Sequence, residues 1–256
     1  MKKLILAFCA GFCCLAACSE QRSELTGTAG SPPETPDSTA QAIAPLPGCT
    51  TAAPLLLPPD QAVSDASLSL YLEDLREAVQ QQDPKRLQSL LDPGIRTGFD
   101  GSGGWEAFSR QWHPENRASE IWLLLDNLLR LGGGYMDAGN PTLYALPYVY
   151  SHWPDSLDAF SHVAVTATGA VLREQPAANA AGVCTLGRVI LQTDYAKSYP
   201  QGGNGTRKEW WYVQLPDGKL SGYVSHSDIY SPVGYRALFN QSEAGKWHMT
   251  ALVAGD

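Results

Sequence analysis

Apolar residues recur every three or four positions after residue 64, which is the spacing of one face of a helix. The stretch ASLSLYLEDLREAVQQQ has this period, and Ser64 or Asp65 can cap its first turn. Asp83-Pro84 ends this helix and begins a second, PKRLQSLLD, because proline is tolerated in a first turn. The apolar positions of the first helix are Leu68, Tyr71, Leu72, Leu75 and Val79.

The next segment predicts a strand and two more helices. The strand is expected around Ile95 to Phe99, and the helices near Trp105 to Trp112 and from Ser119 to Leu131. Consecutive glycines directly after Leu131 end the last of these helices. The following stretch, YALPYVYSHWPDSLDAF, is expected to be irregular, because two prolines interrupt it.

From His162 the pattern changes to short segments typical of β-strands. HVAVTA, AVLRE, GRVILQT, WWYVQL and SGYVSH are separated by turns of Pro, Gly, Asn and Asp. Asp217-Gly218 between two of these segments is a signal for a tight hairpin. Five short strands within about 65 residues predict a small barrel.

The residues after these segments predict one more β-hairpin. Apolar side chains alternate along VGYRALF and along KWHMTALV, and SEAGK supplies the turn. We expect this hairpin to pack back on the helices, so that the barrel is an insertion. The expected fold class is therefore α+β, with a mainly helical domain at 64–161, a barrel at 162–230, and a hairpin at 231–256 that completes the helical domain.

The first residues predict an export signal. Residues 4–17 are apolar and follow Met1-Lys2-Lys3, but they are too few to span a bilayer, which takes ~20 residues. Leu15-Ala16-Ala17-Cys18 resembles the lipobox of bacterial lipoproteins. The resemblance implies that residues 1–17 are a lipoprotein signal peptide, which is removed, and that Cys18 is acylated. A plain secretory signal cleaved elsewhere is the alternative.

A lipoprotein resemblance also implies where the chain resides. Several acyl chains on Cys18 would hold it on a membrane, and Ser19 favours the periplasmic face of the outer membrane by family analogy. Residues 18–63 are rich in Pro, Ser and Thr, a composition that buries too little apolar surface to fold. They predict a tether between the membrane and the folded part.

Charge and cysteine content narrow the partners and the compartment. The chain has a net charge of −8 and no basic run, so nucleic acid is not an expected partner. Two cysteines remain outside the signal and the lipobox, Cys49 and Cys184. In an oxidising periplasm two such thiols pair more often than they stay free, so a disulfide is expected. The alternative is a small buried thiol at Cys184 and an unpaired one at Cys49.

The β segments resemble the bacterial SH3-like (SH3b) domain between about Val163 and Ile229. Two positions depart from the usual pattern, with Val171 in place of Asn and Tyr223 in place of Trp. The resemblance implies a small barrel that binds peptides or cell-wall material, with peptidoglycan or an envelope protein as partner. It rests on Val171-Leu172-Arg173 followed by Pro176, on Gly182 to Gly187, on Trp210 and Val213, and on Asp217-Gly218 and Gly222-Tyr223-Val224.

Aromatic residues near the long insertion 194–209 are the candidate ligand-binding residues. Small SH3-like barrels bind extended peptides through aromatic rings beside a variable loop. We predict a groove made by Tyr199, Trp211 and Tyr223, and we assign Trp210 to the core because its spacing to Val213 matches the family's structural tryptophan. The alternative is that these rings only pack the core and a domain interface.

No arrangement of residues typical of an enzyme is found. DGSGG at 100–104 is a Gly-rich turn, because the residue order and the later histidines do not fit a serine protease. His152, Asp155 and Asp158 are interpreted as surface caps and turn formers. Asp100 with Glu106 could imitate a glycosidase pair, but isolated carboxylates near turns and on helices are the norm. We therefore expect a non-enzymatic binding protein without a metal or cofactor. The alternatives are an envelope hydrolase with an unrecognised site, and an NTF2-like protein with a small-ligand pocket.

Overall fold

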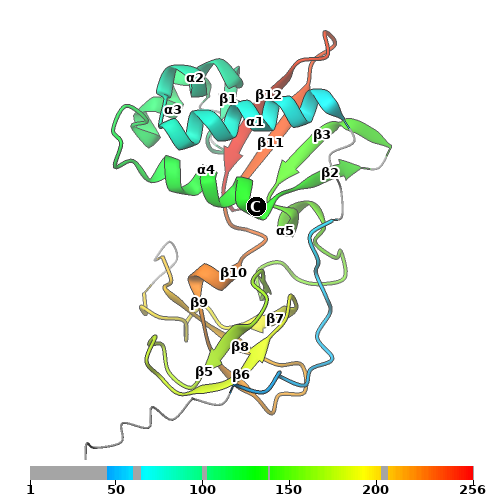
Figure 1. Cartoon of the computed structure of the whole chain (residues 1–256), viewed down its shortest axis with the longest axis vertical. Helices are drawn as coiled ribbons and strands as arrows, with labels where there is room; N and C mark the ends of the chain where they lie inside the picture. Colours follow the sequence, from blue (N-terminus) through cyan, green and yellow to red (C-terminus); the bar gives the residue numbers. More distant parts are fainter. Residues whose placement is uncertain (1–44, 60–64, 100–102, 138, 203–206, 256) are drawn as a thin grey trace, which may run out of the picture. The chain divides into compact units, whose positions relative to one another are not determined.

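The computed structural model of the chain describes residues 45–59, 65–99, 103–137, 139–202 and 207–255 (Figure 1). These residues belong to one compact unit, Ala44–Asp256. The predicted signal peptide, Cys18 and much of the predicted tether lie outside the described residues. In the described unit the strands form one sheet of five strands and one of seven.

The five-stranded sheet is built from both ends of the unit. Its strand order is β1-β12-β11-β3-β2, with β1 parallel to β12 and the other pairs antiparallel. The predicted C-terminal hairpin thus lies in the middle of this sheet. The strands are β1 (Leu91–Arg96), β2 (Gly134–Asp137), β3 (Asn140–Leu146), β11 (Arg236–Gln241) and β12 (Trp247–Val253).

Helices precede and accompany this sheet. The carboxylate of Asp65 caps α1 by accepting hydrogen bonds from the backbone N–H groups of Ser67 and Leu68. The indole N–H of Trp247 donates to the hydroxyl of Ser67 at 3.0 Å, which joins β12 to the start of α1. The helices are α1 (Ala66–Gln81), α2 (Pro84–Leu90), α3 (Gly104–Trp112), α4 (Glu120–Leu131) and α5 (Tyr148–Ser151).

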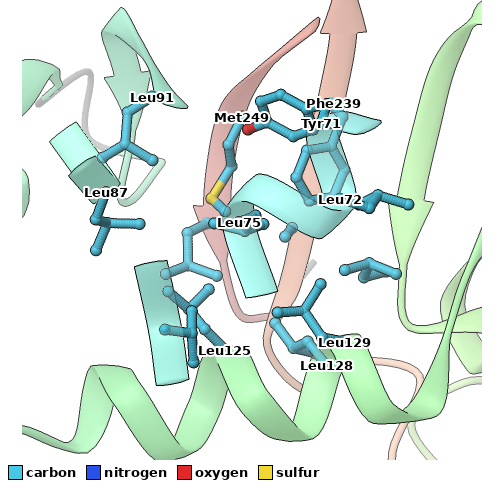
Figure 2. Close-up of a cluster of buried hydrophobic side chains, with 14 of the residues drawn as sticks. Tyr71, Leu72, Leu75, Leu87, Leu91, Leu125, Leu128, Leu129, Phe239 and Met249 are labelled. Atoms are coloured by element: carbon cyan, nitrogen blue, oxygen red, sulfur yellow. The ribbon is translucent and has the colours of Figure 1, made fainter. Parts of the chain in front are cut away.

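The space between these helices and the sheet is filled with apolar side chains. Leu75, Phe239 and Met249 are fully buried there, and the ring of Tyr71 meets the ring of Phe239 edge to face at 5.7 Å. Figure 2 shows leucines of α1, α2 and α4 meeting side chains of β11 and β12. The predicted apolar face of the first helix is therefore the face that enters the core, which confirms that prediction.

The seven-stranded sheet lies between β3 and β11 in the sequence. All its pairs are antiparallel, and its order is β10-β4-β7-β8-β9-β5-β6. A short helix, η1 (His226–Asp228), joins β9 to β10. The strands are β4 (His162–Val165), β5 (Ala170–Arg173), β6 (Gly182–Leu186), β7 (Ile190–Thr193), β8 (Trp210–Gln214), β9 (Ser221–Ser225) and β10 (Ile229–Tyr230).

The segment before α1 lies along the seven-stranded sheet. Gly48 bridges to Thr185 at the outer strand β6, and Leu55 bridges to Val189. The structure joins Cys49 to Cys184 by a disulfide across 135 positions of the sequence. This part of the predicted tether is therefore attached to the sheet and covers the free edge of β6.

The expected fold class is wrong in two respects. The fold is mostly β, with two open sheets, and in the described residues the seven strands end at β10 and β6 rather than closing into a barrel. The C-terminal hairpin forms hydrogen bonds with β1 and β3 instead of only packing on helices. Alternation of apolar residues shows which face of a strand is buried, but it does not fix which strands pair. The end of β3 was expected to be irregular because Pro147 follows it, and no strand was expected at β2.

Candidate binding face

The strands β8 and β9 have one face in the core and one face outside it. Val213 and Val224 are fully buried, and Trp211 is half-buried against the same core cluster. Side chains alternate along a strand, so Trp210 and Tyr212 lie on the opposite face of β8. The register places Tyr212 directly across from Tyr223 of β9.

Four aromatic side chains share this opposite face, and we call them the outer aromatic face. Tyr199 pairs with Trp210 through two backbone hydrogen bonds, and residues paired in this way point to the same side of a sheet. Tyr199 is 48 % exposed, whereas the other three rings are half-buried. The outer aromatic face consists of Tyr199, Trp210, Tyr212 and Tyr223.

Contacts among these rings and a lysine order the face. The rings of Tyr212 and Tyr223 meet edge to face, with centroids 5.5 Å apart. The ammonium of Lys197 lies 5.0 Å from the centroid of Tyr212, which is within the range of a cation–π contact. Lys197 also forms an ion pair with Asp194 at 3.2 Å, and hydrogen bonding to Lys197 lowers the pKa of the Asp194 carboxyl. The face thus carries a cation beside its rings.

Buried polar residues hold the insertion against β8. Ser198 is fully buried, and its hydroxyl donates to the backbone carbonyl of Asp194 and accepts from the backbone N–H of Tyr212. Lys208 is only 2 % exposed, and its ammonium donates to the carbonyl of Pro200 at 2.9 Å. The same ammonium lies 4.1 Å from the ring centroid of Tyr195. These contacts position Tyr199 beside Trp210.

The structure separates the three predicted groove residues. Tyr199 and Tyr223 lie on the outer aromatic face, but Trp211 lies on the inner face, where its indole N–H donates to Nδ1 of His226 at 3.2 Å. Trp210, which we assigned to the core, lies on the outer face instead. The alternation of side chains in WWYVQL places Trp210 and Tyr212 on the same face. The spacing of Trp210 to Val213, taken from the SH3b resemblance, had instead predicted that Trp210 is in the core. We therefore include Trp210 and Tyr212, and exclude Trp211.

The residues considered for catalysis lie in turns and at the surface. Asp158 accepts a hydrogen bond from the backbone N–H of Phe160, and Ser151 contacts the ring of its neighbour His152 at 2.9 Å. Burial lowers the pKa of His152. Glu106 pairs with Arg110 at 3.0 Å on α3, and Asp100 lies outside the described residues. Within the described ranges no group of three His, Cys, Asp or Glu side chains is arranged to hold a metal ion.

Comparisons with known proteins add no family. No protein-family model, curated protein or solved structure matches this chain. Among the helices of the described residues, none is both long and apolar enough to cross a bilayer.

Proposed function

We propose that this protein is a non-enzymatic, lipid-anchored protein of the cell envelope whose outer aromatic face binds peptides of the cell wall. The observation that carries the proposal is the placement of Tyr199, Trp210, Tyr212 and Tyr223 on one side of a sheet, with Tyr199 48 % exposed. Large rigid rings give much contact area while losing few rotatable bonds, and they dominate many binding surfaces. The lipobox at Cys18 would bring this face to the envelope.

The arrangement of the face suits an extended peptide. The rings lie side by side across neighbouring strands, with Tyr199 next to Trp210 and Tyr212 opposite Tyr223. A peptide that crosses these strands therefore meets several rings in succession. Ring faces pack against the apolar parts of a peptide, while Lys197 offers a hydrogen-bond donor at the same surface. Acyl chains on Cys18 would keep the protein at the outer membrane, close to the wall.

The two alternative functions have less support. An NTF2-like pocket for a small ligand requires open space between the helices and the five-stranded sheet. Instead, Leu75, Phe239 and Met249 fill that region and are fully buried (Figure 2). A hydrolase requires a nucleophile or an acid–base pair. The contact between Ser151 and His152 is one between sequence neighbours at the end of the short helix α5, and it gives little support for such a site. A zymogram on purified cell wall tests the hydrolase directly.

Co-sedimentation with purified peptidoglycan sacculi tests the proposal. We expect the full-length protein in detergent to bind sacculi, and Tyr199→Ser and Tyr223→Ser each to weaken binding about tenfold, as for residues central to an interface. Leu123→Ser is the matched control, because Leu123 is a 64 % exposed apolar residue of α4. Sacculi stripped of their peptides should bind poorly. Unchanged binding by both tyrosine variants, or clearing of a zymogram by the wild type, would contradict the proposal.

A further inference from the structure

A pocket of about 390 Å³ lies at the end of β8 and β9 that is nearest the insertion. Ser225, which lines it, is the cross-strand partner of Trp210 and so shares the side of the sheet that carries the outer aromatic face. The pocket therefore adjoins that face. Its lining residues are Arg207, Lys208, Glu209, Ser225 and His226.

This pocket concentrates positive charge in a chain whose net charge is −8. Arg207 and Lys208 both line it, and within the described residues no carboxylate lies within ion-pair distance of either. Lys208 is 2 % exposed, and the partners of its ammonium, the Pro200 carbonyl and the Tyr195 ring, carry no net charge. A buried ammonium without a counter-charge is costly, and an anion beside it would offset that cost.

The histidine of the pocket is held as a hydrogen-bond donor. The indole N–H of Trp211 donates to Nδ1 of His226, so the neutral imidazole carries its proton on Nε2. Burial and the nearby Arg207 lower the pKa of His226, which favours this neutral form. The backbone N–H of His226 donates to the carbonyl of Glu209 at 2.8 Å and fixes the start of η1. The pocket thus adds a neutral donor to its two cations.

A second pocket on α3 provides a contrast. It has a volume of about 360 Å³, and it is also lined by charged residues. There, however, the guanidinium of Arg110 forms an ion pair with Glu106 at 3.0 Å, so this cation has a counter-charge. Among the described residues, cations without an ion-pair partner therefore distinguish the β8–β9 pocket from the α3 pocket.

We propose that the β8–β9 pocket binds a carboxylate of a peptide whose chain lies on the outer aromatic face. Arg207 and Lys208 would supply the positive charge, and Nε2 of His226 would donate a hydrogen bond. The peptide part of this statement rests on the proposed function, but the binding of a carboxylate does not. Glu209 in the same lining limits the affinity for anions.

Nuclear magnetic resonance of the full-length protein tests the pocket without sacculi. The probe is N-acetylalanylalanine, and its C-terminal amide is the matched compound without the negative charge. We expect the acid to shift the indole N–H signal of Trp211, because this group is bonded to His226, and the amide to leave it in place. Arg207→Gln should raise the dissociation constant of the acid about tenfold. Glu209→Gln should lower it.

Controls separate this proposal from the proposed function. Arg110→Gln, on the α3 pocket, should leave the titration unchanged. Equal shifts from the acid and the amide, an equal response to inorganic phosphate, or an unaffected Arg207→Gln protein would overturn the carboxylate assignment. Those results would not affect the proposed function, which is supported if sacculus binding depends on Tyr199 and Tyr223. A titration in which the acid shifts the Trp211 signal, without any sacculus binding, would contradict the proposed cell-wall ligand but would support carboxylate binding in the pocket.

Discussion

In the five-stranded sheet, the large side chains of β11 and β12 are covered by α1 and α4, and Phe239 and Met249 are fully buried. In the seven-stranded sheet, β8 and β9 bury Val213 and Val224 on one face and carry half-buried rings on the other. The aromatic side chain of Phe239 is therefore fully buried under helices in the first sheet, whereas the rings of β8 and β9 in the second are only half-buried. An aromatic ring that is fully buried under a helix contributes to stability, whereas a half-buried ring keeps part of its surface accessible to a ligand.

The largest effect is expected in the helix-covered core. Phe239→Ala removes a fully buried ring that packs against Tyr71 and Tyr144, and should lower the free energy of unfolding by about 4 kcal/mol. Phe160→Ala is the control, because Phe160 is 64 % exposed and should change stability by less than about 0.5 kcal/mol. Urea denaturation measures both. Similar losses for the two variants would remove the contrast between covered and uncovered rings.

The disulfide should contribute the next largest effect. Cys49→Ser breaks the link from the N-terminal segment to β6 and should lower the free energy of unfolding by about 3 kcal/mol. The wild type in a reducing agent should behave like this variant. Thiol titration of the unfolded wild type should find Cys184 free only after reduction. Free Cys184 before reduction would show that the link is not formed in the protein.

A close approach of two strands in the seven-stranded sheet predicts a smaller effect. A Cβ atom on Gly222 would lie 2.4 Å from the carbonyl oxygen of Arg173, so Gly222→Ala must shift β5 away from β9. We expect a loss of about 2 kcal/mol and weaker sacculus binding, since Tyr223 pairs with Arg173. Gly187→Ala has open space around the added methyl group and should be neutral in both measurements. An undisturbed Gly222→Ala protein would contradict this packing.

The smallest effect concerns pH. Burial lowers the pKa of His152 and of His226 below the ordinary value of 6.5, so the unfolded chain binds more protons than the folded one. Stability should therefore decrease as the pH falls through 6.5, and His226→Gln should make this decrease shallower. Lowered carboxyl pKa values such as that of Asp194 act in a more acid window, below the ordinary value of 3.8. Thermal melts measured from above pH 6.5 downward through the histidine window check this, and a melting temperature that stays constant there would contradict the account.

The sequence predicted local structure well where one signal sufficed. The period of Leu68, Leu72 and Leu75 and the cap at Asp65 gave α1 and its buried face. Strand pairing was not predictable in this way, because β1 joins β12 through contacts between opposite ends of the described unit. Local patterns contain no information on such distant pairing.

The candidate site was only half predictable. Tyr199 and Tyr223 were predicted for the groove and lie on the outer aromatic face, and the alternation of WWYVQL already placed Trp210 and Trp211 on opposite faces. Because WWYVQL carries large rings on both faces, its alternation does not show which face is buried, and that follows from Val213 and Val224 facing the core together with Trp211. The pocket beside Trp210 depends on residues 207–209 meeting residues 225 and 226, which no sequence pattern indicates.

The two adjacent tryptophans provide the most direct test of the central claim, that the outer aromatic face of β8 and β9 serves binding while the inner face serves stability. The measurement is sacculus affinity and unfolding free energy for Trp210→Ala and Trp211→Ala, side by side. We predict that Trp210→Ala loses about tenfold in affinity but less than about 1 kcal/mol in stability. Trp211→Ala should lose about 2 kcal/mol in stability, and its folded fraction should still bind. Full sacculus binding by Trp210→Ala, or greater destabilisation by Trp210→Ala than by Trp211→Ala, would contradict the account.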